Sequence, residues 1–370
     1  MMSRPSLKET SPVYQVDDLI LIQECGGMLE IEDADGSRRR LLALLDGSRT
    51  VDEIERDFHA AVPSSGLDVA EAIKDLDEAG VLIDAAEPVR LDAYELERWR
   101  RNLGFFETYA SMSRSKYAMQ EKMRDCKVTL LGLGGIGSHI SLDLLGLGVQ
   151  DLRVVDFDKV ELSNLNRQTL YTEADIGQPK VELAVRRLSA YYPGARIDGI
   201  QRRLNSADDV FAVVAGRDFT ICVVDKPRLH MQRWANQAHV RAGIPYGVGG
   251  VDTQRALMFM VIPGVTGCAE CWRLTAADDA QTRALRAQME PPSDVSTGPD
   301  LAAFGPLVTT VTAMLVTEFV RYITGVAAPV SAGRLMEIRF GDFILREAEQ
   351  WSRLPHCPVC GDAAPAAQAR

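Results

Sequence analysis

The stretch Leu130-Leu-Gly-Leu-Gly-Gly-Ile-Gly-Ser138 predicts a buried strand, a tight glycine turn and the start of a helix. Gly132, Gly134, Gly135 and Gly137 let the backbone turn sharply and approach a ligand closely, and the N-terminus of the helix favours a phosphate group. Asp156 ends the next apolar stretch, where a ribose-binding carboxylate is expected. This pattern fits NAD as well as ATP, and a glycine-rich packing turn without a ligand is the structural alternative.

Apolar and amphipathic stretches alternate from Cys126 to the end of the chain. KVTLLGLG, DLRVVDFD, FTICVVD and IPYGVGG predict strands, whereas GSHISLDLLGLG, PKVELAVRRLSAYY and RLHMQRWANQAHVRAG predict helices. The alternation predicts an α/β fold, a Rossmann-like doubly wound parallel sheet with helices on its faces. Residues 304–320 predict a buried helix, because this apolar stretch carries several threonines and Glu318. Residues 275–301, rich in Asp, Ala, Pro and Ser, predict a mobile loop.

Two blocks after Asp156 favour ATP over NAD. The first is Ser163-Asn-Leu-Asn-Arg-Gln168 and the second is Asp175-Ile-Gly-Gln-Pro-Lys180. Arg167 and Lys180 supply fixed cations, which a reacting triphosphate needs and a dinucleotide oxidoreductase does not. Asp225 ends the strand FTICVVD at the carboxyl edge of the sheet, where a carboxylate can hold magnesium against the triphosphate.

The segments LLGLGGIGS, VVDFDKVELSNLNRQ, DIGQPK and VVD, in this order and spacing, resemble the ThiF/MoeB/HesA adenylation domain, a ubiquitin-activating-like fold. The resemblance implies an adenylyltransferase that uses ATP to activate a carboxylate, and a homodimer. It implies that Asp156 binds the ribose, that Asn164, Arg167 and Lys180 bind the phosphates, and that Asp225 positions magnesium. The nucleotide-binding residues that it further implies are Gly132, Gly134, Gly135, Gly137, Asp158 and Gln168.

Residues 89–125 are charged and helical in pattern, which predicts a connecting arm. Arg98-Trp-Arg-Arg101 matches an R-x-x-R pair that precedes the first strand in this family. The resemblance implies that Arg101 reaches the ATP of the partner subunit, so that the catalytic residues are Arg101, Arg167, Lys180 and Asp225. A solvent-exposed basic face on the arm is the simpler alternative.

Two C-x-x-C pairs, Cys268/Cys271 and Cys357/Cys360, predict a tetrahedral zinc site with four thiolate ligands and a structural role. A redox pair is the alternative, but both pairs lie in turns and not at the start of a helix that follows a strand. Family members that transfer the acyl group to a thiol carry a further cysteine after the first pair. No cysteine lies between Cys271 and Cys357, so we expect no thioester step.

Residues 1–88 predict a small winged-helix-like α+β domain. LILIQECGGMLEIED predicts two strands and VLID another, and RRRLLALLD, TVDEIERDF and VAEAIKDLDEAG predict three helices. The pattern, LLDGSRTVDEI above all, resembles the PqqD-like leader-peptide recognition element, which implies that an extended peptide binds as an added strand. A winged-helix dimerisation or DNA-binding module is the alternative. The acidic stretches Glu30–Asp33 and Asp75–Glu78 argue against DNA.

The composition limits the partners of the chain. A formal net charge of −11 over 370 residues argues against a nucleic-acid or anionic-membrane surface. We expect a cytoplasmic location, because the N-terminus does not resemble a signal peptide and no stretch predicts a membrane span.

We expect three regions: a peptide-recognition domain (1–88), the arm (89–125) and the adenylation domain (126–370). The layout resembles microcin C-type and pantocin-type enzymes, which implies adenylation of a carboxylate on a ribosomally made precursor peptide. Two alternatives stay open. One is a non-catalytic presenter of leader peptides to an azole-forming cyclodehydratase, and the other is a sulfur-carrier adenylyltransferase of the thiamine or molybdopterin type.

Overall fold

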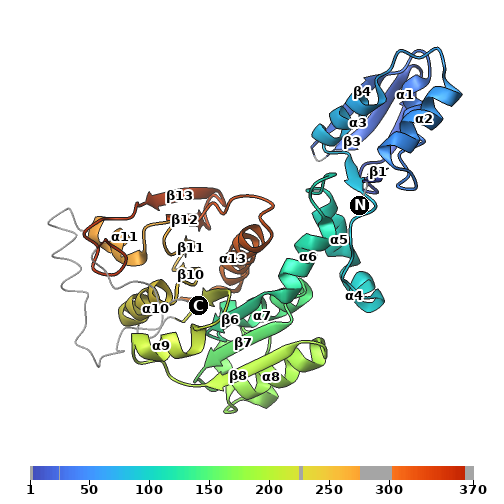
Figure 1. Cartoon of the computed structure of the whole chain (residues 1–370). Coiled ribbons are helices and arrows are strands. Elements are labelled where there is room, and N and C mark those ends of the chain that lie inside the picture. The colour runs from blue at the N-terminus through green and yellow to red at the C-terminus, as the bar shows by residue number, and fades with distance from the viewer. Residues whose placement is uncertain (1–2, 25, 225–227, 276–301, 363–370) are drawn as a thin grey trace. The chain divides into compact units, whose positions relative to one another are not determined.

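The computed structural model describes residues 3–24, 26–224, 228–275 and 302–362. The chain divides into two compact units, Met1–Met123 and Arg124–Arg370 (Figure 1). Cys25, Asp225 and nearly all of the expected mobile loop therefore lie outside the described residues.

Two small antiparallel sheets form the first unit. Strands β3 (Leu19–Glu24) and β4 (Gly27–Glu32) are the predicted pair. A strand that the sequence did not predict, β2 (Val13–Val16), adds to the other edge of β3, giving the order β2-β3-β4. The predicted last strand, β5 (Leu82–Asp84), pairs with β1 (Pro5–Leu7). Strand β2 escaped prediction because all four of its residues are exposed and show no apolar alternation.

Three helices cover one face of the β2-β3-β4 sheet: α1 (Ser37–Leu42), α2 (Val51–Ala61) and α3 (Val69–Glu78). A capping box starts α2, where the backbone N–H of Glu53 donates to Thr50 and the backbone N–H of Thr50 donates to Glu53. Ile20 and Ile22 of β3 pack with residues of all three helices in one core, and burying each such side chain contributes about 1.5–3 kcal/mol.

The predicted arm forms α4 (Ala93–Arg98), α5 (Arg100–Glu107) and α6 (Lys116–Asp125). Two long-range hydrogen bonds join it to the small unit. The Thr10 N–H donates to Glu107 at 2.9 Å, and the Met112 N–H donates to Asp77 at 2.8 Å. The arm up to Met123 thus belongs to the first compact unit.

The second unit contains an eight-stranded sheet with a doubly wound parallel part. Its order is β8-β7-β6-β9-β10, formed by β6 (Lys127–Leu131), β7 (Asp151–Asp156), β8 (Arg196–Gln201), β9 (Phe219–Cys222) and β10 (Tyr246–Asp252). The connecting helices are α7 (Gly135–Gly146), α8 (Lys180–Tyr191), α9 (Ala207–Val214) and α10 (Arg228–Ala242). Helix α7 packs with α8, and α9 packs with α10. The strand order reverses between β6 and β9, which creates a ligand-binding crevice at their carboxyl ends.

The sheet is mixed, which corrects the prediction of a parallel sheet. After β10 it continues with the antiparallel strands β11 (Arg255–Val261), β12 (Arg334–Arg339) and β13 (Leu345–Gln350). Nothing in the pattern of these segments distinguishes an antiparallel extension from another βα unit, because strand direction depends on the connections. The parallel strands β6 to β10 still form the predicted doubly wound arrangement.

Helix α13 (Gly305–Thr324) is the one described helix with the length and apolarity of a membrane span, and 56% of its most apolar window is buried inside the protein. It packs on α7, β10 and β11. A Cβ on Gly249 of β10 would lie 2.4 Å from Leu315, so glycine permits the close approach of helix and strand. The prediction of a buried helix agrees with this packing.

Candidate nucleotide site, cysteine cluster and grooves

The glycine turn requires glycine at two positions for steric reasons. Gly132 has a φ of +101°, and a Cβ there would lie 3.1 Å from the backbone of Val223 after β9. A Cβ on Gly137 would lie 1.9 Å from the carbonyl oxygen of Gly132. The absence of both side chains lets α7 start directly above the turn. Its first N–H groups, which have no partner within the helix, then point at the crevice and can hold a phosphate.

Asp156 and Lys180 both connect to this turn. The Asp156 carboxylate is buried and accepts hydrogen bonds from the backbone N–H of Leu133 at 2.6 Å and of Asp158 at 2.8 Å. Asp158 in turn pairs with the buried Lys180 ammonium at 3.3 Å and accepts the Lys180 backbone N–H at 3.0 Å. The structure thus brings together an acid at the end of β7 and a cation at the start of α8.

The block 163–168 lies on the other side of the turn. Asn164 is buried, and its side-chain oxygen accepts the Glu161 N–H at 3.2 Å, so it orders the loop. A Cβ on Gly135 would lie 3.1 Å from the Arg167 side chain, which places that guanidinium stem against the start of α7. The Arg167 guanidinium donates to the carbonyl of Ser163 at 3.0 Å and to the Asn166 side chain at 2.7 Å.

Gln168 carries a buried polar atom without a partner. Its side-chain oxygen makes no hydrogen bond among the described residues. The side-chain nitrogen would lie 3.9 Å from a Cβ on Gly134, so the amide is next to the turn. A buried unpaired amide oxygen costs about 1–3 kcal/mol, which a ligand donor group at this position would offset.

Three further residues brace the site and were not predicted as site residues. The Tyr171 hydroxyl donates to the carbonyl of Leu133 at 3.0 Å, and burial raises the pKa of Tyr171, so it remains a neutral donor. Asp175 accepts hydrogen bonds from Thr172 and Arg187, and its pKa is lowered because these bonds outweigh its burial. The sequence offered no signal for Tyr171 or Arg187, since their partners lie far along the chain.

Arg101 and Asp225 are not placed in this cluster. Arg101 lies on α5 of the first unit, where its side chain is exposed and makes no ion pair with any described residue. Asp225 lies outside the described residues. Their expected roles in catalysis and magnesium binding stay predictions.

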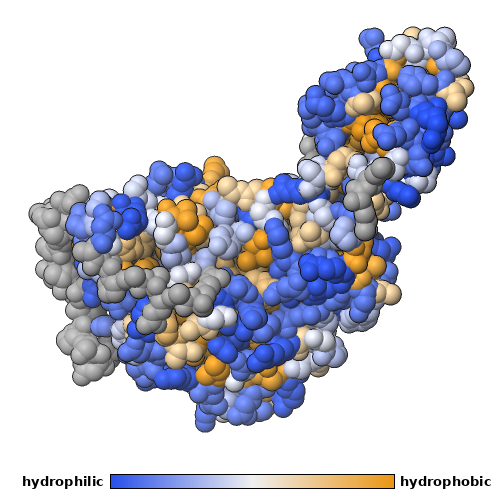
Figure 2. Space-filling model, viewed as in Figure 1, coloured by the Kyte–Doolittle hydropathy of each residue, from blue (hydrophilic) through white to orange (hydrophobic). Residues whose placement is uncertain are grey.

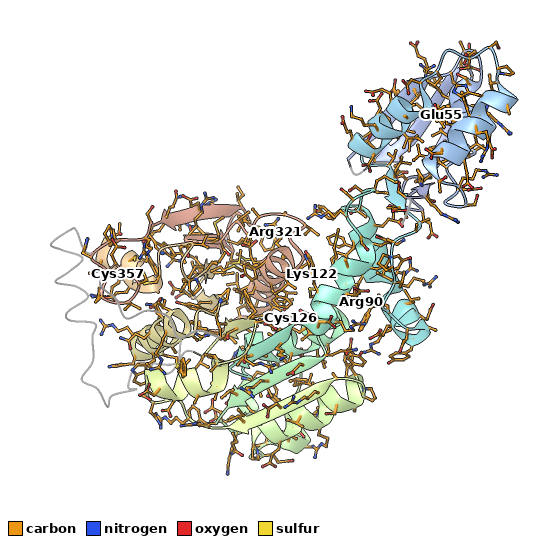
Figure 3. All side chains as sticks on the ribbon, viewed as in Figure 1. Glu55, Arg90, Lys122, Cys126, Arg321 and Cys357 are labelled. Atoms are coloured by element: carbon orange, nitrogen blue, oxygen red, sulfur yellow. The ribbon has the colours of Figure 1, made fainter. Side chains whose placement is uncertain are left out.

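The four predicted cysteines form one cluster, with all four sulfur atoms within 4.8 Å of one another. The Cys268–Cys357 and Cys268–Cys271 sulfur distances are 3.7 and 3.9 Å. Tetrahedral zinc with Zn–S bonds of about 2.3 Å places its ligand sulfurs about 3.8 Å apart, so the donors fit this ion. Figure 3 shows Cys357 in the second unit.

Neighbouring groups donate hydrogen bonds to these sulfurs. The Asn236 amide donates to Cys268 at 3.5 Å, and the Leu354 N–H donates to Cys271 at 3.4 Å. The Tyr246 hydroxyl donates to Asn236 at 3.0 Å and holds that amide in place. Such donors reduce the negative charge that four thiolates impose on a buried zinc site.

Two described cysteines outside the cluster are unsuited to covalent catalysis. Cys126, labelled in Figure 3, and Cys222 are both buried. Burial raises the pKa of Cys126 to about 12 and that of Cys222 to about 11. Both remain protonated thiols at neutral pH, whereas an acyl acceptor must be an accessible thiolate.

A groove of 310 Å³ lies between β4 and α3 in the first unit. Strand β4 pairs only with β3, so its outer edge has no neighbouring strand among the described residues. The visible surface of this unit is hydrophilic around a smaller hydrophobic area (Figure 2). The residues that line this β4–α3 groove are Leu29, Ile31, Arg38, Leu41, Leu42, Leu67, Asp68, Glu71, Ala72, Asp75, Leu76 and Ala79.

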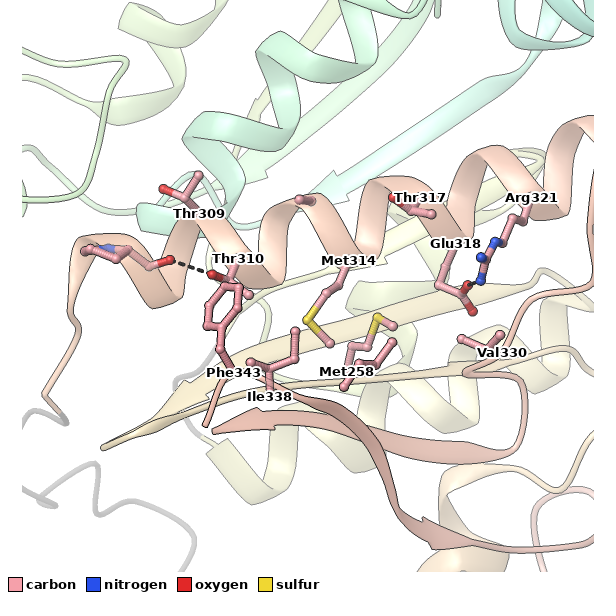
Figure 4. A pocket seen from close by; sticks show the side chains of 13 residues that line it. Met258, Thr309, Thr310, Met314, Thr317, Glu318, Arg321, Val330, Ile338 and Phe343 are labelled. Atoms are coloured by element: carbon pink, nitrogen blue, oxygen red, sulfur yellow. Dashed lines mark hydrogen bonds and ion pairs between the residues drawn. The ribbon is translucent and has the colours of Figure 1, made fainter. Parts of the chain in front are cut away.

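A second groove of 710 Å³ follows α13 in the other unit. Met314 of the helix and Met258 and Ile338 of the sheet line its apolar part, and the Glu318–Arg321 ion pair closes one end (Figure 4). The helix begins beside the nucleotide cluster, since Gly305 closely approaches the Asn166 carbonyl oxygen.

Comparison with known proteins identifies the family. The sequence pattern of the ThiF family matches residues 106–359, which include the glycine turn, both downstream blocks and three of the four clustered cysteines. The chain belongs to the ThiF family. The sulfur carrier protein adenylyltransferase of Thermus thermophilus is 30% identical over 251 residues, covering 66% of this chain and 85% of the relative. The ThiS adenylyltransferase of Escherichia coli is 30% identical over 254 residues, covering 65% of this chain and 88% of the relative.

These relatives confirm the expected enzyme class for this ThiF-family chain, an adenylyltransferase. The fold also matches solved structures. A structure of Escherichia coli MccB with succinimide superposes with a TM-score of 0.76 over 97% of this chain and 99% of that chain, at 21% identity. PaaA superposes with a TM-score of 0.71 over 94% of this chain and 100% of its own, at 23% identity. At such low identity these matches show the fold alone.

Proposed function

We propose that this ThiF-family enzyme uses Mg–ATP to adenylate a carboxylate of a ribosomally made precursor peptide. The observation that carries the proposal is the cluster at the glycine turn. There the acid Asp156 and the cation Arg167 contact the glycine turn at the start of α7, and the cation Lys180 is joined to it through Asp158. The unpaired oxygen of Gln168 beside Gly134 supports a polar ligand at the same place.

The reaction is an in-line displacement at the α-phosphorus. A carboxylate oxygen of the peptide forms the new bond to phosphorus, the bond to the bridging oxygen breaks, and pyrophosphate leaves with the electron pair. A carboxylate is already deprotonated at neutral pH, so the step needs no general base. The enzyme acts by positioning the reactants and by stabilising the developing negative charge.

Each charged residue has a place in this mechanism. Asp156 binds the ribose, whereas Arg167 and Lys180 neutralise the phosphates with Asn164. Asp225 would hold the magnesium ion, which would withdraw charge from the triphosphate. Arg101 comes from the partner subunit of a homodimer, and its side chain on α5, which is exposed and pairs with no described residue, supports this role. Zinc at the cysteine cluster is structural, because four thiolates leave no open position for catalysis.

The β4–α3 groove supports a peptide substrate. Its open strand edge offers unpaired backbone groups, and its apolar floor offers pockets for alternate side chains, which are the two features that bind an added strand. The first unit then acts as a PqqD-like recognition element that holds the precursor while the second unit activates its carboxylate. The buried Cys126 and Cys222 support direct capture of the adenylate by a nitrogen nucleophile or its transfer to another protein, without a thioester.

A sulfur-carrier adenylyltransferase is the second candidate function. The names of the relatives that match about two thirds of this chain favour it. The two functions differ in substrate: a precursor peptide in one, a small protein ending in Gly-Gly in the other. The groove in the first unit favours the peptide.

Calorimetric titration of Mg–ATP into the wild-type chain and Lys180→Ala tests the adenylation site. Loss of a buried cation that contacts phosphate costs about 1.5–3 kcal/mol, so we expect affinity to fall about 10- to 100-fold. Lys159→Ala is the matched control, because Lys159 lies in the adjoining block but its side chain is exposed. Equal affinities of wild type and Lys180→Ala would reject the assigned phosphate site.

A further inference from the structure

The lip of the β4–α3 groove is acidic. Asp68, Glu71 and Asp75 line the helix side, and Arg38 is the one basic residue in the lining. Asp68 is engaged as the N-cap of α3, where it accepts the Glu71 N–H at 3.0 Å. Glu71 and Asp75 are one helical turn apart on the same face, so both carboxylates can meet a ligand that runs along the groove.

These two carboxylates have little local compensation. Glu71 pairs with Lys74 at 3.3 Å, but both side chains of this pair are well exposed, and such a pair is weak. Asp75 makes no ion pair within the described part of the chain. A cation that enters the groove can therefore pair with these two carboxylates, because the helix itself neutralises them only weakly.

The outer face of β4 is acidic as well. Leu29 and Ile31 are partly buried and face the groove, whereas Glu30 and Glu32 alternate with them and are exposed. Side chains of an added strand alternate in the same way. Those on the groove side would lie near Glu71 and Asp75, and those on the other side would lie beside Glu30 and Glu32.

We propose that this groove selects an extended peptide segment rich in lysine and arginine. The inference rests on the proposed binding of a peptide along β4, and it specifies the charge that this peptide carries. Cross-strand pairs of opposite charge stabilise an added strand, and like charges directly opposite destabilise it. An acidic segment is therefore rejected, and affinity for a basic one falls as salt screens the attraction.

Fluorescence anisotropy with synthetic peptides tests this selection on the full chain. Three labelled nine-residue peptides share one Val/Ala/Thr scaffold and differ at three positions, which carry Lys, Gln or Glu. At low ionic strength we expect the Lys peptide to bind about tenfold more tightly than the Glu peptide, with Gln between them. The difference should shrink in 0.5 M salt, where the Debye length falls to about 4 Å.

A variant without the two groove carboxylates distinguishes the effect of charge in the groove from the effect of the net charge of the chain. In Glu71→Gln/Asp75→Asn the preference for Lys over Glu should fall below about threefold. The matched control is Glu55→Gln/Glu78→Gln, which removes the same charge from α2 and α3 at positions that do not line the groove. Glu55 is labelled on α2 in Figure 3. The control should keep the wild-type preference.

Equal affinities for the three peptides, no binding of any of them, or a full preference in the groove variant would each overturn the inference. Titration of Mg–ATP on the same samples is independent of this outcome. A chain that prefers the Lys peptide but fails to bind ATP contradicts the adenylation proposal alone. A chain that binds ATP but ignores peptide charge contradicts the groove selectivity alone.

Discussion

Gly137 and Gly134 lie in the same turn but have different surroundings. An added Cβ on Gly137 would lie 1.9 Å from the Gly132 carbonyl oxygen, whereas the nearest atom to a Cβ on Gly134 is a flexible side-chain nitrogen at 3.9 Å. The first contact forces the turn and α7 apart, and the second is an ordinary van der Waals contact. The shape of the phosphate site thus depends on glycine at position 137, whereas position 134 has room for a methyl group.

We expect Gly137→Ala to lower the free energy of unfolding by about 2–4 kcal/mol, because the backbone of the turn must shift. Mg–ATP binding should be lost with it. Gly134→Ala is the steric control and should cost less than about 1 kcal/mol as a change at the helix N-cap. Urea unfolding and calorimetry measure both quantities. A Gly137→Ala protein as stable as the wild type would show that the turn is shaped differently.

The cysteine cluster joins elements that are far apart in the chain. Cys268 and Cys271 lie at the start of α11 (Ala269–Thr275), which corrects the prediction that both pairs lie in turns, and Cys357 and Cys360 lie in a turn after β13. Trp272 of α11 and Trp351 after β13 stack with ring centroids 5.1 Å apart. In the second turn, a Cβ on Gly361 would lie 2.4 Å from the Cys357 carbonyl oxygen, so glycine keeps the two cysteines close.

Metal analysis should find one zinc ion per chain. The double variant Cys357→Ser/Cys360→Ser should contain almost none and should unfold at a lower temperature, since structural zinc contributes several kcal/mol to folding, on the order of 10 kcal/mol in small domains. Cys126→Ala controls for the loss of a buried thiol and should keep its zinc. Equal zinc in the double variant and the wild type would remove the four-thiolate assignment.

At the scale of the whole molecule, the two compact units carry different parts of the proposed mechanism. The first carries the peptide groove and Arg101, and the second carries the nucleotide cluster and the cysteines. If Arg101 acts on the ATP of a partner subunit, no single chain holds a complete catalytic site. Activity then requires the association of two chains, and mixing two inactive variants tests this requirement.

Light scattering should give twice the chain mass of 40.7 kDa. Arg101→Ala and Lys180→Ala should each bind Mg–ATP weakly. An equimolar mixture, refolded or coexpressed, should regain about a quarter of the wild-type tight sites. Half of randomly formed dimers are mixed, and each mixed dimer has one intact site of two. Arg100→Ala is the neighbouring control, because Arg100 pairs only weakly with Glu97 at 3.9 Å. A mixture that regains nothing would show that Arg101 does not act on the partner's ATP, and normal Mg–ATP binding by Arg101→Ala alone would place Arg101 outside the site.

The local pattern was enough to predict the glycine turn, most strands and helices from β6 to β10, and the four-cysteine cluster, whereas β8 and α9 were not predicted. In each case the information lies within a few residues: glycine spacing dictates a turn, hydrophobic period dictates an element, and C-x-x-C dictates a chelating loop. The capping box at Thr50 and Glu53 is local in the same way. Such features can be predicted from the sequence alone because the residues that determine them lie close together along the chain.

Only the tertiary structure decided the rest. The antiparallel strands β11 to β13, the bracing of the turn by Tyr171, the unpaired oxygen of Gln168 and the groove between β4 and α3 all depend on residues far apart in the chain. Strand direction, burial and charge environment are properties of packed neighbours, and the free energy of packing is shared among elements and not contained in any one of them. The sequence by itself therefore determined the chemistry available to this protein, and the packing determined where that chemistry meets a ligand.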